Sequence, residues 1–197
     1  MFYRFAKGLF RLFFDYVCHW QVVGRENQPL EGPVVVICNH VSNWDPIALG
    51  VSLDRQVCYM AKQELFRVPV LGTLIKWLGA FPVKRGGGDR GALRAAQETL
   101  NQGKMIGMFP EGTRSKNGEL LPFKPGAAVL AVRTGAPILP VALVGIKSIW
   151  YRGWFRPFKV LIGKPIPVEK PETVQSEMVN ELSARAQQAV ADLLQQG

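Results

Sequence analysis

Cysteine and histidine are both scarce in this chain. Its 197 residues include three cysteines and two histidines. So few cysteines, and an odd number of them, exclude a scaffold built on disulfide bonds and favour a reducing compartment. Histidine, cysteine and aspartate nowhere cluster with the spacing of a zinc site. Disorder is excluded as well, because 48% of the residues are hydrophobic and so apolar a chain aggregates unless it folds.

Acidic residues are few relative to basic ones. The 24 lysines and arginines exceed the 15 aspartates and glutamates and give a formal net charge of +9. Such an excess implies an anionic partner, which composition alone leaves open between nucleic acid, a lipid surface and a phosphorylated small molecule. Residues 169–197 hold two basic and five acidic side chains in the pattern of a solvated amphipathic helix. The positive charge therefore belongs to residues 1–168.

Long apolar runs are missing too, since no stretch approaches the roughly 20 apolar residues of a transmembrane helix. The first 20 residues are unlike a signal peptide, because Arg11 and Asp15 interrupt the apolar stretch and no small-residue cleavage site follows. On a helical wheel Arg4, Lys7 and Arg11 share one narrow sector opposite a very broad aromatic face. This pattern predicts that residues 1–22 form an amphipathic helix in a membrane interface, with packing on the protein core as the alternative. In the interface we expect Arg4, Lys7 and Arg11 to face lipid headgroups.

Residues 147–156 repeat this combination of basic and aromatic side chains. Trp150, Tyr151 and Trp154 suit the headgroup boundary of a bilayer, and Arg152 and Arg156 suit its phosphates. We therefore expect peripheral or monotopic attachment to the cytoplasmic face of the cell membrane, with the membrane surface as a partner.

Residues 23–197 alternate short apolar strands with helices, which predicts a single α/β domain. We expect a largely buried mixed sheet flanked by helices and preceded by the N-terminal amphipathic helix. The predicted strands cover residues 34–38, 57–61, 81–83, 105–109, 138–144 and 158–162, and the predicted helices cover residues 45–53, 65–78, 92–102 and 126–134. The helix over residues 65–78 is expected to kink or to start at Pro69.

His40 is the first candidate for chemistry, because it directly follows a predicted buried strand. Open α/β sheets present their ligand sites at that end of a strand, and the ordinary pKa of histidine, about 6.5, suits a general base. If the loop is tight, Asp45 can fold back onto the imidazole and fix its tautomer, as the carboxylate of a serine-protease triad does. The alternative makes Asp45 an ordinary helix N-cap followed by Pro46 and makes His40 a loop residue.

A protein nucleophile is not evident. Cys38 lies two residues before His40, but it ends an apolar strand, where a buried cysteine behaves as a small inert hydrophobe. No Gly-x-Ser-x-Gly elbow occurs. If His40 is a base, we expect the hydroxyl that it activates to belong to the substrate.

A second group of candidates follows another predicted strand, at residues 109–115. Gly112 lets backbone amides approach an anion, Thr113 adds a donor, and Arg114 offers a bidentate fork for phosphate. Lys124 lies before the helix predicted from residue 126, whose N-terminus also favours anions. Arg85 follows a further strand. Convergence of these loops at one sheet edge predicts a phosphate site.

Four ordered blocks of the sequence resemble the glycerolipid acyltransferases, and most of all the 1-acylglycerol-3-phosphate acyltransferases, also called lysophosphatidic acid acyltransferases. The blocks are His40-x4-Asp45, Gly79-x-Phe-x-x-x-Arg85, Phe109-Pro-Glu-Gly-Thr-Arg-Ser115 and Leu139-Pro-Val-Ala-Leu143.

This resemblance implies transfer of a fatty acyl group from acyl-CoA or acyl-carrier protein to the free sn-2 hydroxyl of lysophosphatidate, which gives phosphatidic acid in phospholipid biosynthesis. His40 would be the base and Asp45 its partner, and no metal or organic cofactor is required. The residues implied to bind the acceptor are Arg85, Glu111, Gly112, Thr113, Arg114 and Lys124.

Two alternatives remain. One is an acyltransferase for another lysophospholipid acceptor, and the other is a non-catalytic basic module that binds anionic lipid or nucleic acid. The second leaves the settings of His40, Asp45 and Glu111 unexplained, so we expect no nucleic acid partner.

Overall fold

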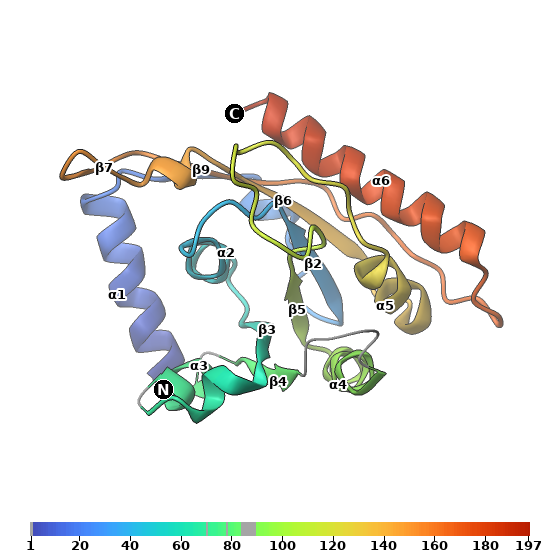
Figure 1. Cartoon of the computed structure of the whole chain (residues 1–197). Coiled ribbons are helices and arrows are strands. Elements are labelled where there is room, and N and C mark those ends of the chain that lie inside the picture. The colour runs from blue at the N-terminus through green and yellow to red at the C-terminus, as the bar shows by residue number, and fades with distance from the viewer. Residues whose placement is uncertain (1, 70, 78, 84–89) are drawn as a thin grey trace.

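A mixed sheet of seven strands lies between two layers of helices in the computed structural model, which describes residues 2–69, 71–77, 79–83 and 90–197 (Figure 1). Neighbouring strands run parallel except at β6 and β9, which pair antiparallel. The predicted α/β class with a mixed sheet is therefore confirmed. In spatial order the strands are β1 (Gln21–Val23), β9 (Lys159–Ile162), β6 (Ile138–Val144), β2 (Val34–Cys38), β5 (Met105–Met108), β3 (Val57–Lys62) and β4 (Phe81–Val83).

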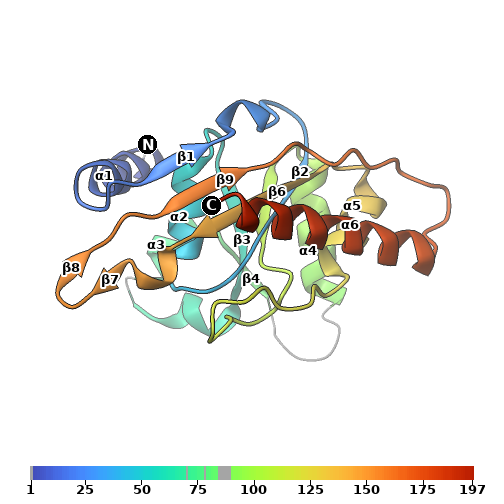
Figure 2. The ribbon, with the colours of Figure 1, turned by 90° about the horizontal axis from the view of Figure 1, so that it is seen from above.

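Helices cover both faces of this sheet (Figures 1 and 2). On one face lie α1 (Phe2–Tyr16) and α2 (Asp45–Ser52), and on the other lie α4 (Arg90–Asn101), α5 (Gly126–Thr134) and α6 (Ser176–Gln195). The sequence of central strand β2 is an unbroken apolar run because both faces of this strand are buried. Val34, Val36 and Cys38 face the core under α1 and α2, whereas Val35 and Ile37 face the opposite core, and all five are buried.

The helix predicted over residues 65–78 is divided around Pro69, where a kink or a start was expected. A 3-10 turn covers Gln63–Arg67, and helix α3 covers Leu71–Trp77. Pro69 lies between the two segments and disfavours a helical conformation for the residue before it.

The N-terminal helix ends at Tyr16, six residues before the expected boundary at residue 22. The chain turns at His19, which has a positive φ of 47° and lies outside the helix. Strand β1 then pairs with β9. Residues 21–23 are consequently an edge strand of the sheet, and their pairing with residues 159–161 is a contact that no local pattern reveals.

The apolar surface of α1 is divided between the protein and the solvent. Phe14 is fully buried against the core, whereas Phe5, Leu9, Leu12 and Tyr16 are exposed, with Phe5 70% exposed. Packing on the protein core, given above as the alternative, therefore holds for one side of the helix. Exposed apolar side chains occupy the other side, and their place in a membrane interface stays a prediction.

One expectation about the charges of α1 is wrong. Lys7, which we expected to face lipid headgroups, donates hydrogen bonds to the backbone carbonyls of Leu53 and Asp54 just after α2. Arg4 and Arg11 remain exposed.

A small hairpin of β7 (Trp150–Tyr151) and β8 (Trp154–Phe155) extends from the sheet at the same end of the molecule as α1 (Figures 1 and 2). Phe155 packs edge-on against Phe13 of α1, with ring centroids 4.9 Å apart. Within the described residues, no helix combines the length and apolarity needed to cross a membrane.

Candidate active site

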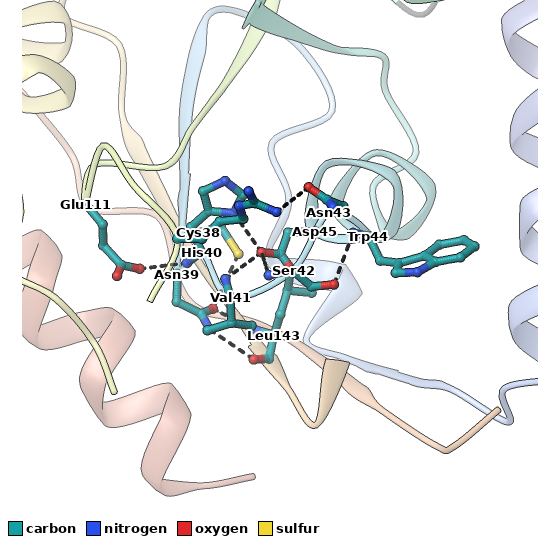
Figure 3. Close-up of polar contacts among 11 residues, drawn as sticks. Cys38, Asn39, His40, Val41, Ser42, Asn43, Trp44, Asp45, Glu111 and Leu143 are labelled. Atoms are coloured by element: carbon teal, nitrogen blue, oxygen red, sulfur yellow. Dashed lines mark hydrogen bonds and ion pairs between the residues drawn. The ribbon is translucent and has the colours of Figure 1, made fainter. Parts of the chain in front are cut away.

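His40 and Asp45 meet in the loop that joins β2 to α2 (Figure 3). Nδ1 of His40 lies 2.7 Å from Oδ2 of Asp45. The same oxygen accepts hydrogen bonds from the backbone N–H groups of Val41 and Ser42, each at 2.7 Å. Asp45 is the first helical residue and Trp44 occupies the N-cap position, so the interpretation of Asp45 as an ordinary N-cap is wrong. The carboxylate instead folds the loop back onto the imidazole.

This geometry sets the protonation of the imidazole ring. Asp45 is fully buried, and the side chain of His40 is 20% exposed. An ionised carboxylate only accepts hydrogen bonds, so Nδ1 must carry the hydrogen. Nε2 is then the basic nitrogen and the one available to a substrate.

Phe109 provides a surface for the imidazole. Its ring stacks on that of His40 with centroids 4.2 Å apart and planes 23° apart. Phe109 directly follows β5, and β5 is parallel to β2 with Ile37 opposite Met108. Parallel neighbours end at the same sheet edge, so the two loops that follow them meet there.

The 109–115 loop also holds the backbone of His40. Oε1 of Glu111 accepts a hydrogen bond from the N–H of His40 at 2.6 Å, and the N–H of Ser115 donates to the carbonyl of His40 at 2.7 Å. Oε2 of Glu111 accepts from the N–H of Leu121 at 3.1 Å. Burial raises the pKa of Glu111, while the two backbone donors act in the opposite direction. Glu111 is buried and bound to backbone on both oxygens, so it joins loops rather than facing solvent.

Asn39 anchors the loop to the other neighbouring strand. Its buried side chain donates to the carbonyl of Leu143 at 3.0 Å and accepts from the N–H of Leu143 at 2.8 Å. Sequence reasoning missed this pair. The available signal was a polar residue directly between an apolar strand and His40.

The predicted anion-binding residues lie on the exposed side of the same loops. Gly112, Thr113, Arg114 and Lys124 are all exposed. Nη1 of Arg114 donates to Oδ1 of Asn43 at 2.6 Å, which links this group to the loop of His40.

Lys124 lies directly against Gly112. A Cβ atom on Gly112 would come within 2.7 Å of Nζ of Lys124, and the positive φ of 73° at this position further favours glycine. Arg85 lies outside the described residues, as does neighbouring Lys84.

Cys38 has none of the properties of a nucleophile. It is fully buried at the end of β2, and burial raises the pKa of its thiol well above the ordinary range, with the carboxylates of Asp45 and Glu111 adding to the effect. In the described part of the chain, no group of three or more potential protein ligands could hold a metal ion.

Comparisons with known proteins identify the family of this chain. Residues 19–144 match the acyltransferase family profile. The chain is 34% identical over 169 residues to the 1-acyl-sn-glycerol-3-phosphate acyltransferase of Bacillus subtilis, a match that covers 83% of this chain and 82% of that protein. It is also 34% identical to the chloroplastic 1-acyl-sn-glycerol-3-phosphate acyltransferase BAT2 of Brassica napus, over 82% of this chain and 49% of the plant protein, so it spans about half of the latter.

A solved structure has the same fold. The 1-acyl-sn-glycerophosphate (LPA) acyltransferase PlsC from Thermotoga maritima superimposes with a TM-score of 0.79 and is 28% identical. The superposition covers 98% of this chain and 79% of that one. The chain therefore belongs to the acyltransferase family, within the 1-acylglycerol-3-phosphate acyltransferases, and it is an enzyme. The resemblance predicted from the four sequence blocks is confirmed.

Proposed function

We propose that the enzyme transfers a fatty acyl group from a thioester, carried by CoA or by acyl-carrier protein, to the sn-2 hydroxyl of 1-acylglycerol-3-phosphate. The product is phosphatidic acid. The observation that carries this proposal is the His40–Asp45 pair at 2.7 Å beside an exposed basic loop. The names of the relatives in Bacillus subtilis and Thermotoga maritima support the same acceptor.

His40 acts as the general base. Nε2 takes the proton of the acceptor hydroxyl while that oxygen attacks the thioester carbonyl. Asp45 keeps the hydrogen on Nδ1 and stabilises the imidazolium that forms. When the tetrahedral intermediate collapses, the carbon–sulfur bond breaks, and the imidazolium returns its proton to the departing thiolate. The acyl group thus moves directly to the acceptor, without an acyl-enzyme on Cys38.

The exposed basic residues hold the phosphate of the acceptor. Arg114 can present two parallel N–H groups to phosphate oxygens, and Lys124 adds a second positive charge beside Gly112. Thr113 contributes a hydroxyl donor on the same loop. We also assign phosphate binding to Arg85, because this arginine ends the second of the four sequence blocks. Glu111 positions these loops around His40 through its two backbone hydrogen bonds.

Membrane attachment places the enzyme where its acceptor is found. Exposed apolar side chains of α1 and of the β7–β8 hairpin form what we call the outer aromatic surface. Four exposed arginines in or next to the same two segments accompany them: Arg4, Arg11, Arg152 and Arg156. Aromatic side chains favour the headgroup boundary, and arginines favour anionic lipid. These properties support peripheral or monotopic attachment at the cytoplasmic face of the cell membrane. The surface consists of Phe5, Leu9, Leu12, Tyr16, Trp150, Tyr151 and Trp154.

Acyl transfer from labelled acyl-CoA or acyl-carrier protein to lysophosphatidate tests the proposal. The wild-type protein should form phosphatidic acid, and His40→Ala should lower the rate about 10²- to 10⁴-fold with unchanged circular dichroism. Turnover of the His40→Ala variant at the wild-type rate would exclude this mechanism. Faster transfer to a lysophospholipid with a larger headgroup would identify that lipid, and not lysophosphatidate, as the acceptor. Lipid binding without any acyl transfer would favour the non-catalytic module.

A further inference from the structure

Tyr59 of β3 lies close to the catalytic pair although it belongs to none of the sequence blocks. It is opposite Gly107 in the parallel pairing of β3 with β5. A Cβ atom on Gly107 would lie 2.5 Å from Cε1 of Tyr59 and 2.7 Å from Cγ1 of Val57. Only glycine at position 107 therefore lets the tyrosine ring lie against the backbone of β5.

From this position Tyr59 contacts the ring of Phe109, which stacks on the imidazole, and the helical turn that carries Asp45. Its ring is nearly parallel to that of Phe109, with planes 8° apart and centroids 6.4 Å apart, and Phe109 in turn stacks on His40. Its hydroxyl donates to the carbonyl of Pro46 at 2.9 Å. Pro46 follows Asp45 directly in the first turn of α2.

We propose that Tyr59 is a positioning residue for the His40–Asp45 pair. It supports the ring that fixes the plane of the imidazole, and through its hydroxyl it holds the helical turn that fixes the carboxylate. The inference rests on the proposed function and adds a residue to it. Misplacement of a catalytic group by about 1 Å can cost on the order of 10²-fold in rate, so support at both points bears directly on turnover.

The environment of the hydroxyl suits this role. Burial is the largest cause that raises the pKa of Tyr59 well above its ordinary value, and nearby Tyr3 adds to it. The phenol therefore stays protonated over the working pH range and remains a donor to Pro46. Aromatic packing alone would need no hydroxyl at this position.

Substitutions separate the two contacts. Tyr59→Leu removes the ring and the hydroxyl and should lower kcat about 10- to 100-fold, with the KM for lysophosphatidate within about twofold of wild type. Tyr59→Phe keeps the ring, and the loss should shrink to between about 3- and 10-fold.

Tyr3→Phe is the matched control. It removes the other tyrosine hydroxyl that donates to α2, at the carbonyl of Gly50, 3.3 Å away. Gly50 lies in α2 beyond the turn that carries Asp45, so kcat should stay within about twofold of wild type.

Nitrogen NMR of histidine-labelled protein reports on the imidazole independently of turnover. The sequence has only two histidines, so the spectrum of His40→Ala assigns the signals of His40. Wild type should show the tautomer with hydrogen on Nδ1, and Tyr59→Leu should broaden that signal or mix the tautomers.

A wild-type imidazole spectrum in Tyr59→Leu overturns the proposal, whatever kcat does. If Tyr59→Leu does not fold, the spectrum and kcat of Tyr59→Phe decide by the same criteria. A wild-type protein that fails to acylate lysophosphatidate contradicts the proposed function, while the spectra still test the role of Tyr59.

Discussion

The backbone N–H of His40 donates a hydrogen bond of 2.6 Å to Oε1 of Glu111, a residue 71 positions further along the chain. The carbonyl of His40 accepts from Ser115 of the same loop. Both backbone groups of His40 are thus held by the segment that also carries Arg114. A substrate bound by its phosphate to that segment is therefore placed in fixed relation to the imidazole, which is the condition for efficient proximity catalysis.

Two substitutions of Asp45 should separate the effect of its negative charge on catalysis from its effect on the stability of the loop. In Asp45→Asn an amide oxygen still accepts from Val41 and Ser42, but the negative charge is lost. We expect kcat to fall about 10²- to 10⁴-fold with a nearly unchanged free energy of unfolding. Asp45→Ala should lose a further 1–3 kcal/mol or so of stability, because two partly buried N–H groups lose their acceptor. Steady-state kinetics and urea unfolding measure the two effects, and wild-type kcat in Asp45→Asn would contradict the assigned role.

Arg114→Ala should weaken binding of the phosphorylated acceptor. A charge-assisted hydrogen bond contributes about 1.5–3 kcal/mol, so the KM for lysophosphatidate should rise about 10- to 100-fold while kcat changes little. Arg133→Ala provides a matched control, since this arginine is also exposed but lies in the last turn of α5. A monoacylglycerol acceptor, which lacks the phosphate, should show the same rate with Arg114→Ala as with wild type. An equal loss with both acceptors would exclude phosphate recognition by Arg114.

Cys38→Ala should retain turnover within about threefold of wild type. The thiol is buried and its raised pKa keeps it protonated at neutral pH, so it cannot serve as the attacking thiolate. Iodoacetamide at neutral pH should accordingly leave the folded enzyme active. Rate assays on the variant and on the alkylated protein check this, and a loss as large as that of His40→Ala would favour a covalent intermediate.

Polar substitutions on the outer aromatic surface should reduce membrane binding. Leu9→Ser, Trp150→Ser and Trp154→Ser each remove an exposed apolar side chain, and burying one such side chain in the interface contributes about 1.5–3 kcal/mol. The triple variant should lose most of its binding to phosphatidylglycerol vesicles in flotation assays. Leu30→Ser, at a comparably exposed leucine before β2, should bind like wild type. Equal binding of the triple variant would show that another surface meets the membrane.

Local pattern was sufficient for much of the fold. The β-branched run of β2 predicted a strand whose bounds match the structure, and so did the apolar run of β6. The edge strand β1 and the β7–β8 hairpin were missed. Two- and three-residue strands have no periodicity to detect, and β1 exists through its pairing with a distant strand.

The sequence by itself determined the chemical groups of the site and their order along the chain: a histidine after one strand, an aspartate five residues later, and a basic glycine-containing loop after another strand. Only the tertiary structure decided which of them face solvent. Glu111 turns inward to two backbone amides, and Lys7 turns to the end of α2. Tyr59 reaches the catalytic pair across β5. The contacts of Glu111 with His40 and of Tyr59 with Phe109 join residues far apart in the chain. They form because parallel strands bring their carboxyl ends to one edge, a relation that no local pattern of residues contains.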